Sequence, residues 1–291
     1  MIIVQLNGGL GNQLFQYATG RKLAIRNNTE LKLDLTLLED LPHEVFSLKH
    51  FNINADILEK KEANKFYKKN IISRIIRKSK ALTRTGKNKY IKEKEWYIFD
   101  PDILKLPDNT YLSGYWQSEK YFFDIEETIK QELCLDISLS QKSCEAEETI
   151  KSLNNTVSLH IRRGDYITNP KVFDYFGVCS LDYYNNCINK LNKIIGNLNI
   201  FVFSDDPSWA KNNLETSNKL FFIEHNNNLN AYEDLYLMSI CENNITANSS
   251  FSWWGAWLNK NKDKYIFAPK YWVIKEKNKK LDIVPNSWNR V

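Results

Sequence analysis

The chain has 291 residues, of which 43% are hydrophobic and 13% are aromatic. It is long enough for one large domain or two domains of ordinary size, each with its own core, and this composition excludes a disordered protein. The net charge of +5 is unevenly spread, because residues 60–94 hold fourteen Lys and Arg against two Glu, a local balance of +12. Basic residues confined to one segment do not indicate a nucleic-acid groove, so we predict no nucleic-acid partner.

Two features predict a cytoplasmic protein. The chain opens directly on the apolar run 2–6, without the segments of a signal peptide, and no stretch reaches the ~18 unbroken apolar residues of a spanning helix. The five cysteines are odd in number and show no C-x-x-C spacing, which favours reduced thiols over disulfides or a zinc site. We therefore expect no glycan on the four Asn-x-Ser/Thr triplets, which begin at Asn27, Asn154, Asn244 and Asn248.

The first half of the chain opens as a strand, a glycine turn and a helix. We expect strands over 2–6 and 30–35, with the turn Asn7–Asn12 and a helix over 13–25 between them. The turn is neither a dinucleotide-binding motif nor a P-loop, because Leu14 replaces the third glycine of G-x-G-x-x-G and no Gly-Lys-Ser/Thr follows. It is either an ordinary tight turn or a place where backbone N–H groups approach an anion.

The basic segment 60–94 is expected to be helical. Ile71 and Ile75 follow Tyr67 at i, i+4 spacing, the pattern of a short amphipathic helix. One interpretation is a solvated helix with one side on the core. The other is a peripheral helix that contacts an anionic membrane at the inner face of the cell membrane.

The second half alternates strands and helices. An acidic stretch near 126–148 is taken as the boundary, giving domains 1–152 and 153–291. Within the second domain we expect strands over 156–161, 199–204, 220–223 and 244–247, and helices over 181–191, 207–214, 231–242 and 251–258. Short strands separated by helices predict an α/β fold with a parallel, doubly wound sheet.

An arginine pair follows the first strand of this half. Arg162, Arg163 and Gly164 come directly after the strand 156–161, at the edge where an open α/β sheet binds its ligand. A guanidinium matches phosphate in a bidentate manner and stays charged at physiological pH. The expected ligand is a phosphate or pyrophosphate, and the alternative is a surface turn with solvated charges.

Polar residues also follow two further strands. Asp205 and Asp206 can accept paired hydrogen bonds from guanine or from a ribose diol, although with Pro207 they also match an ordinary helix start. Ser249 and Ser250 offer hydroxyls and helix-terminal N–H groups to a pyrophosphate. Because these strand ends share one edge of the sheet, a single ligand can contact all three groups.

Four blocks of sequence together resemble glycosyltransferase family 11, the α-1,2-fucosyltransferases. They span residues 7–17, 160–166, 203–206 and 248–258 and cover nearly the whole chain in order. The resemblance implies a fold of GT-B type, with two Rossmann-like domains facing a cleft. It also implies inverting, metal-independent transfer of L-fucose from GDP-β-L-fucose to the 2-hydroxyl of a terminal β-galactoside.

The resemblance implies roles for individual residues. The implied donor-binding residues are Arg162 on the β-phosphate, His160 beside guanine or phosphate, Arg163, Asp205 or Asp206 on guanine, Ser249, Ser250 and Phe251 along the diphosphate, and Gly9, Gly11 and Asn12 closing over it. Arg162 and Asp165 are the candidate catalytic residues. Fixed positive charge on Arg162 stabilises the leaving group. Asp165 either deprotonates the acceptor hydroxyl or braces the arginines.

No cofactor or metal is expected. The four histidines are far apart, no H-E-x-x-H occurs, and Asp100-Pro101-Asp102 matches D-x-D only formally, in an aromatic, proline-broken turn. The expected partners are GDP-fucose and a galactose-terminated oligosaccharide or glycolipid. One alternative is a protein O-fucosyltransferase, for which a signal peptide and disulfides would be expected. Another is a non-enzymatic anionic-ligand or RNA-binding protein, which would not explain phosphate-type motifs at three strand ends.

Overall fold

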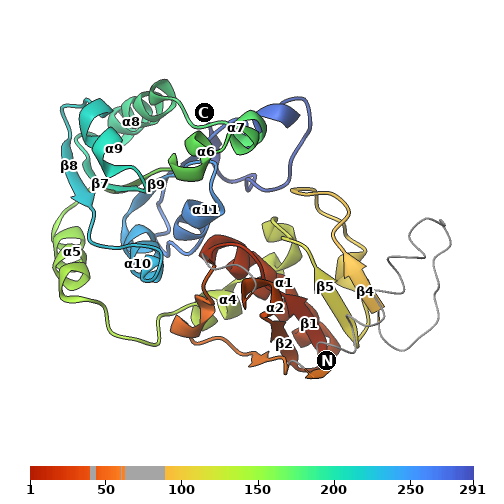
Figure 1. The fold of residues 1–291 in the computed structure, drawn as a ribbon. Coiled ribbons are helices and arrows are strands. Elements are labelled where there is room, and N and C mark those ends of the chain that lie inside the picture. Colours follow the sequence, from red (N-terminus) through yellow and green to blue (C-terminus); the bar gives the residue numbers. More distant parts are fainter. Residues whose placement is uncertain (40–43, 60, 63–88) are drawn as a thin grey trace. The chain divides into compact units, whose positions relative to one another are not determined.

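The computed structural model describes residues 1–39, 44–59, 61–62 and 89–291. The described chain forms two compact units, Met1–Cys134 and Leu135–Val291, each built around one sheet (Figure 1). In both sheets every paired strand runs parallel to its neighbour. The α/β class expected from the sequence is confirmed.

The boundary between the units differs from the expected one at 152/153. It falls after Cys134, because helix α5 (Gln141–Ser152) packs on the second unit. Ile150 of this helix belongs to an apolar cluster with Phe201 and Leu237. Ser140, the N-cap of α5, donates a hydrogen bond of 2.6 Å to Glu233. The acidic stretch therefore contains two helices that belong to different units.

The first unit has a five-stranded sheet in the order β3-β2-β1-β5-β4. Its strands are β1 (Ile2–Gln5), β2 (Leu31–Asp34), β3 (Asp56–Ile57), β4 (Lys89–Lys92) and β5 (Thr110–Ser113). Helix α1 (Leu10–Asn27) connects the parallel strands β1 and β2, as expected, but begins at Leu10 because Gly9 adopts the extended conformation of an N-cap. Shorter helices are α2 (Thr36–Glu39) and α4 (Glu126–Glu132).

The helix expected around Ile71 and Ile75 lies outside the described residues. The end of the basic segment is described and is not helical, because Lys89–Lys92 forms the edge strand β4. This strand pairs with β5 from Lys89 opposite Thr110 to Lys92 opposite Ser113. Exposed lysines are common on edge strands, where they oppose further strand pairing. Sheet pairing thus replaces the expected helix at this end.

The second unit has a six-stranded sheet in the order β11-β10-β9-β6-β7-β8. Its strands are β6 (Thr156–Ile161), β7 (Asn199–Ser204), β8 (Lys219–Ile223), β9 (Asn243–Ile245), β10 (Ile266–Ala268) and β11 (Asn289–Arg290). Its helices, besides α5, are α6 (Gly164–Thr168), α7 (Pro170–Phe176), α8 (Leu181–Ile195), α9 (Pro207–Asn213), α10 (Ala231–Ile240) and α11 (Ser250–Trp257). The four strands and four helices expected between 156 and 258 are confirmed, with small shifts at their ends.

Two apolar clusters hold this second sheet between its helices. Val157 and Leu159 of β6 pack with Tyr184 and Cys187 of α8, while Phe201 of β7 belongs to the cluster that includes α10. Every residue of β6 is buried, which is typical of a central parallel strand covered on both faces. The sheet edge that carries the polar motifs is therefore rigidly positioned.

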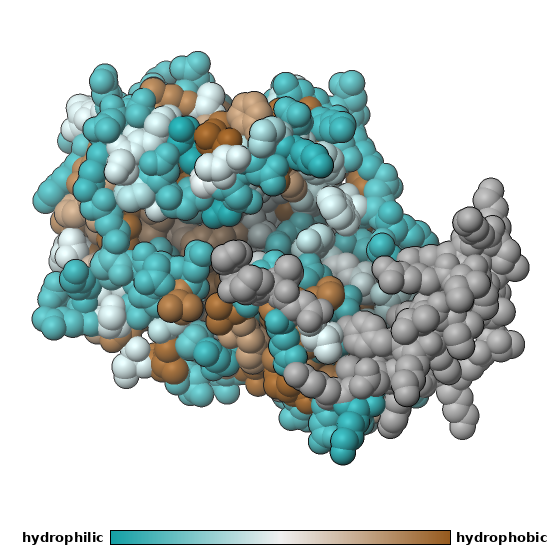
Figure 2. All heavy atoms as spheres, in the orientation of Figure 1, coloured by the Kyte–Doolittle hydropathy of each residue, from teal (hydrophilic) through white to brown (hydrophobic). Residues whose placement is uncertain are grey.

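Polar and apolar side chains are interspersed on one face of the protein (Figure 2). Figure 2 shows polar side chains over most of the visible face, with hydrophobic ones between them. None of the helices that the structure describes combines the length and apolar character needed to span a bilayer. All five cysteines lie in the described residues and are free thiols.

Candidate functional site

The strand order of the second unit brings the three predicted motifs together. Strand β6 pairs with β7 on one side and with β9 on the other. The chain runs from β6 to β7 and β8 on one side and then crosses to β9 on the other side, so the strand order reverses at β6. In an open α/β sheet, ligands bind at the carboxyl ends of the strands at this kind of reversal. Arg162 follows β6, Asp205 follows β7 and Ser249 lies shortly after β9.

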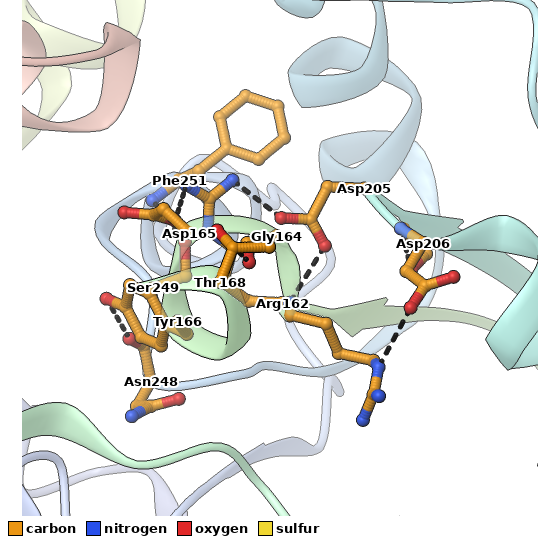
Figure 3. Close-up of polar contacts among 12 residues, drawn as sticks. Arg162, Gly164, Asp165, Tyr166, Thr168, Asp205, Asp206, Asn248, Ser249 and Phe251 are labelled. Atoms are coloured by element: carbon orange, nitrogen blue, oxygen red, sulfur yellow. Dashed lines mark hydrogen bonds and ion pairs between the residues drawn. The ribbon is translucent and has the colours of Figure 1, made fainter. Parts of the chain in front are cut away.

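Asp205 fixes the arginine block, by which we mean Arg162, Arg163 and Gly164. Its Oδ2 lies 2.9 Å from Nη1 of Arg162, and its Oδ1 accepts a 2.8 Å hydrogen bond from the backbone N–H of Arg163 (Figure 3). A Cβ atom at Gly164 would come within 2.5 Å of Asp205 Oδ2, so any larger residue there must displace the carboxylate. Glycine at this position thus permits the contact between the two strand ends.

Arg162 is held from two further sides. Its Nη2 lies 2.6 Å from Oδ1 of Asp165, and its guanidinium carbon lies 5.6 Å from the ring centroid of Tyr166. The side chain nevertheless remains 35% exposed. A guanidinium has five N–H donors, so the two carboxylate contacts leave donors for a ligand. Arg162 is thus a fixed and accessible positive charge at the sheet edge.

Arg163 is directed to a different environment. Its Nε lies 3.0 Å from Oδ2 of Asp206, and its guanidinium carbon lies 4.1 Å from the ring centroid of Trp209. Oδ1 of Asp206 accepts the N–H of Trp209 at 3.1 Å and caps helix α9. Asp206 is therefore the N-cap of α9, which is one of the two roles that the sequence allowed. The Arg163 side chain lies against Asp206 and Trp209, away from the contacts of Arg162.

His160 is buried and electrically neutral. Burial, together with the nearby charge of Arg162, lowers the pKa of its imidazole to about 3. Its Nδ1 is buried without a hydrogen-bond partner, and its ring centroid lies 5.7 Å from that of Phe251. Buried polar atoms are nearly always paired, so an exception calls for an explanation such as strain, an ordered water or a functional role. His160 and Phe251 thus lie together beside Arg162, and their contact with a donor stays a prediction.

Asn248 connects the loop after β9 to its surroundings. Its Nδ2 donates to the carbonyl oxygens of Phe176, Gly177 and Trp272 at 3.2, 3.3 and 3.3 Å. Its own carbonyl accepts a 3.2 Å hydrogen bond from the hydroxyl of Tyr166 (Figure 3). Tyr166 thus joins this loop to Arg162. The sequence motifs contained Asn248 and Tyr166 but did not predict these contacts. The four-residue spacing of Arg162 and Tyr166 was the one sequence feature that could have indicated their proximity.

The serines follow Asn248 at the start of helix α11. Ser249 is the N-cap, and its Oγ accepts the N–H of Phe251 at 3.4 Å. Ser250 begins the helix and is half-buried. The N-terminus of helix α11 thus lies at the sheet edge that carries Arg162.

The glycine turn belongs to the first unit, at the carboxyl end of β1. Gly8 has a positive φ of 76°, Gly9 caps α1 and Gly11 is buried inside it. Oδ1 of Asn12 accepts a 2.8 Å hydrogen bond from Gln117. These contacts fix the turn within its own unit. The closure of Gly9, Gly11 and Asn12 over a donor stays a prediction.

No group of three or more potential metal-ligating side chains is gathered among the residues that the structure describes. The two aspartates of the D-x-D match are each paired with lysine. Asp100 lies 2.9 Å from Lys94, and Asp102 lies 2.9 Å from Lys105.

Comparison with known proteins identifies the family. Residues 1–291 match the family model described as "Glycosyl transferase family 11". It is 37% identical to an alpha-1,2-colitosyltransferase of Escherichia coli over 301 residues, covering 100% of this chain and 99% of the relative. It is 36% identical to the O-antigen biosynthesis glycosyltransferase WbnK of Escherichia coli, covering 97% and 98% of the two chains.

One solved structure shares the fold. A variant of FUT1 from Arabidopsis thaliana in complex with GDP aligns with a TM-score of 0.55 at 13% identity, covering 91% of this chain and 69% of that chain. Two units with parallel sheets agree with the GT-B type expected from the sequence. The chain therefore belongs to glycosyl transferase family 11 and is a glycosyltransferase with a fold of the GT-B type.

Proposed function

We propose that the protein transfers L-fucose from GDP-β-L-fucose to the 2-hydroxyl of a terminal β-galactoside, with inversion, giving an α-1,2 linkage. The observation that carries the proposal is Arg162, held between Asp205 and Asp165 at the strand reversal and still exposed. Family membership supports glycosyl transfer. The structural relative that contains GDP supports a guanosine diphosphate donor.

Arg162 would act on the leaving group. Cleavage of the bond between the sugar and the β-phosphate leaves negative charge on GDP while the sugar gains oxocarbenium character. A preorganised donor aimed at such charge contributes on the order of 3–4 kcal/mol. Because Asp205 and Asp165 already orient the guanidinium, little reorganisation accompanies the reaction. We propose that this fixed charge replaces a metal ion.

The contact between Asp165 and Arg162 supports the bracing role for Asp165. Its carboxylate is 54% exposed and lies 2.6 Å from Nη2 of Arg162. A bracing carboxylate keeps its charge throughout the reaction, whereas a general base must accept a proton. An Asp165→Asn variant assayed with acceptors whose hydroxyls differ in acidity separates the roles. A loss that depends on acceptor acidity supports the base, and a uniform loss supports bracing.

A second candidate donor is a GDP-linked colitose, favoured by the 37% identity to an alpha-1,2-colitosyltransferase. Colitose is L-fucose without its 3-hydroxyl. A site that hydrogen-bonds this hydroxyl would reject colitose strongly, whereas an apolar site would discriminate weakly. The ratio of kcat/KM for the two donors therefore decides between them. Preference for the colitose donor would replace the proposed sugar and leave the rest of the mechanism intact.

The direct test measures donor and acceptor separately. We expect GDP and GDP-fucose to raise the melting temperature more than UDP and ADP do. We also expect transfer to lactose, with the new linkage assigned by NMR. Equal shifts for all four nucleotides would count against the proposal. The relative named for O-antigen biosynthesis supports a surface-glycan acceptor, which we propose is modified in the cytoplasm.

A further inference from the structure

A cavity with several charged residues in its lining lies at the carboxyl ends of β10 and β11, outside the sequence motifs. It has a volume of about 250 Å³, and its charged lining consists of Lys270, Lys277, Lys279, Arg290 and Glu276. None of its lining residues belongs to the arginine block. Four cations around one carboxylate give the cavity a positive balance, which favours an anionic ligand.

The single carboxylate does not cancel this charge. Oε1 of Glu276 accepts a 3.2 Å hydrogen bond from the hydroxyl of Tyr175, and Oε2 lies 3.6 Å from Nζ of Lys279. Oε2 is also screened from solvent. Glu276 therefore acts mainly on Lys279. The charges of Lys270, Lys277 and Arg290 remain available to the cavity.

These remaining cations are positioned by neighbours that carry no charge. The ammonium groups of Lys270 and Lys277 lie 5.4 and 5.6 Å from the ring centroid of Tyr271. Nη2 of Arg290 donates a 2.8 Å hydrogen bond to the carbonyl of Val284. A neutral carbonyl uses one of five guanidinium N–H donors, so the others can bind an oxyanion. The arrangement suits a phosphate group.

One exposed apolar side chain lines this cavity, and two others lie on the segments beside it. Tyr271 is 42% exposed and Ile274 37% exposed, and Ile274 packs against Gly177 at the end of α7. Phe173, one turn before Gly177 in α7, is 41% exposed. Aromatic and aliphatic side chains beside lysines are typical of surfaces that contact the headgroup region of a bilayer.

We propose that this cavity binds the phosphate group of an anionic membrane lipid, while Tyr271, Ile274 and Phe173 contact the bilayer surface. The proposal does not depend on the identity of the donor or acceptor sugar. Asn248 connects the cavity wall to the arginine block through its hydrogen bond to the carbonyl of Trp272. Lipid binding at this place would hold the second unit with its transfer site close to a membrane.

The test compares the full chain with charge-reversal variants in vesicle co-sedimentation. We expect binding to phosphatidylcholine vesicles that contain phosphatidic acid and little binding to phosphatidylcholine alone. The double variant Lys270→Glu/Lys277→Glu should lose at least about tenfold in vesicle affinity, since each basic residue near such a surface adds ~1 kcal/mol. Lys260→Glu/Lys262→Glu is the matched control, because both lysines are exposed and precede β10 at the opposite edge of the sheet.

A third variant distinguishes lipid from free phosphate. Phe173→Ser/Ile274→Ser should weaken vesicle binding and leave the binding of inorganic phosphate, measured by calorimetry, unchanged. Neither residue lines the cavity, and Tyr271 stays in place beside its lysines. The melting temperature should be closely similar in all variants and serves as the control for folding, whichever sugar the enzyme transfers. Equal vesicle affinity of the cavity and control variants would overturn the proposal. This outcome is also the one expected if residues 60–94, and not the cavity, bind the vesicles. Phosphate binding without any vesicle binding would overturn the lipid as the ligand.

Discussion

Oδ2 of Asp205 and Nη1 of Arg162 lie 2.9 Å apart, across the ends of two neighbouring strands. The contact follows from the register of the sheet, in which Ile161 of β6 lies opposite Ser204 of β7. The residues that follow these two strands are therefore brought together by backbone pairing. An arginine fixed in this way is oriented before any ligand arrives, which is what electrostatic catalysis requires.

Replacing Arg162 with lysine should lower turnover by at least about a hundredfold, on the order of 3 kcal/mol in the transition state. Lysine keeps the charge but loses the planar group that contacts both Asp205 and Asp165. The measurement is kcat with lactose and saturating GDP-fucose. Arg163→Lys is the control, because the Arg163 guanidinium lies on the ring of Trp209. This variant should lower the melting temperature and change kcat much less than Arg162→Lys does. Similar kcat values for both variants would contradict the distinction.

The adjacent aspartates should behave differently when changed to asparagine. Asp205→Asn removes the charge that orients Arg162, so turnover should fall. Asp206→Asn keeps a good N-cap for α9 and should have a smaller effect on turnover. The guanine-reading role predicts instead that one variant raises the KM for GDP-fucose alone, because base contacts are equal in the ground and transition states. Steady-state kinetics with GDP-fucose as the varied substrate separates the outcomes.

Gly164→Ala should impair the site without removing any functional group. The added methyl would lie 2.5 Å from Oδ2 of Asp205, so the carboxylate must move away from Arg162. We expect kcat to fall by about tenfold or more, in the same direction as Asp205→Asn. The double variant should then be no worse than Asp205→Asn alone. Additive losses would show that the methyl group acts elsewhere.

Activity should persist in EDTA. The fixed charge of Arg162 is proposed to stabilise the GDP leaving group in place of a metal. Initial rates of transfer to lactose should be compared in chelator, in buffer and with added Mg²⁺ or Mn²⁺. Loss of activity in chelator followed by recovery on adding metal would show that a cation takes part.

His160 should make the fold less stable at acidic pH. Its folded-state pKa of about 3 lies below the ordinary value near 6.5, so between these values the unfolded chain binds a proton that the folded chain excludes. This contribution to the unfolding free energy therefore falls as pH decreases through that window. Between pH 6.5 and 5, the unfolding free energy of the wild type should fall by about 2 kcal/mol more than that of His160→Gln. Urea melts at both pH values test this, because other titrating groups cancel in the comparison. Equal losses would show that the imidazole is solvated.

The sequence predicted the centre of the second sheet because both central strands carry a clear apolar pattern. Strand β7 is a nearly continuous apolar run, and β6 alternates apolar with polar residues. It did not predict β10 and β11, which have three and two residues and carry too little pattern. Helices α6 and α7 were also not predicted, because they bury no residue completely and therefore show no apolar periodicity. Element length and burial thus limited the prediction.

Within the site, the sequence predicted which residues gather but not which of them contact each other. Arg162 and Arg163 were expected on one ligand, yet Arg162 lies beside Asp205 and Arg163 beside Asp206. Successive side chains of an extended chain point in opposite directions, so neighbouring guanidiniums diverge. The choice between Asp205 and Asp206 depended on the register of β6 with β7, which a single sequence does not encode locally.

The burial of two asparagines restricts how this protein can be produced. Asn244 and Asn248 both begin Asn-x-Ser/Thr triplets, and their side chains are 1% and 2% exposed. Nδ2 of Asn244 donates to Ser158 Oγ at 2.7 Å, and Nδ2 of Asn248 donates to three carbonyls. A glycan attached to either nitrogen would have to replace these bonds inside the core. Expression through a eukaryotic secretory pathway would modify the nascent chain before it folds, so glycosylated molecules should be retained as misfolded protein.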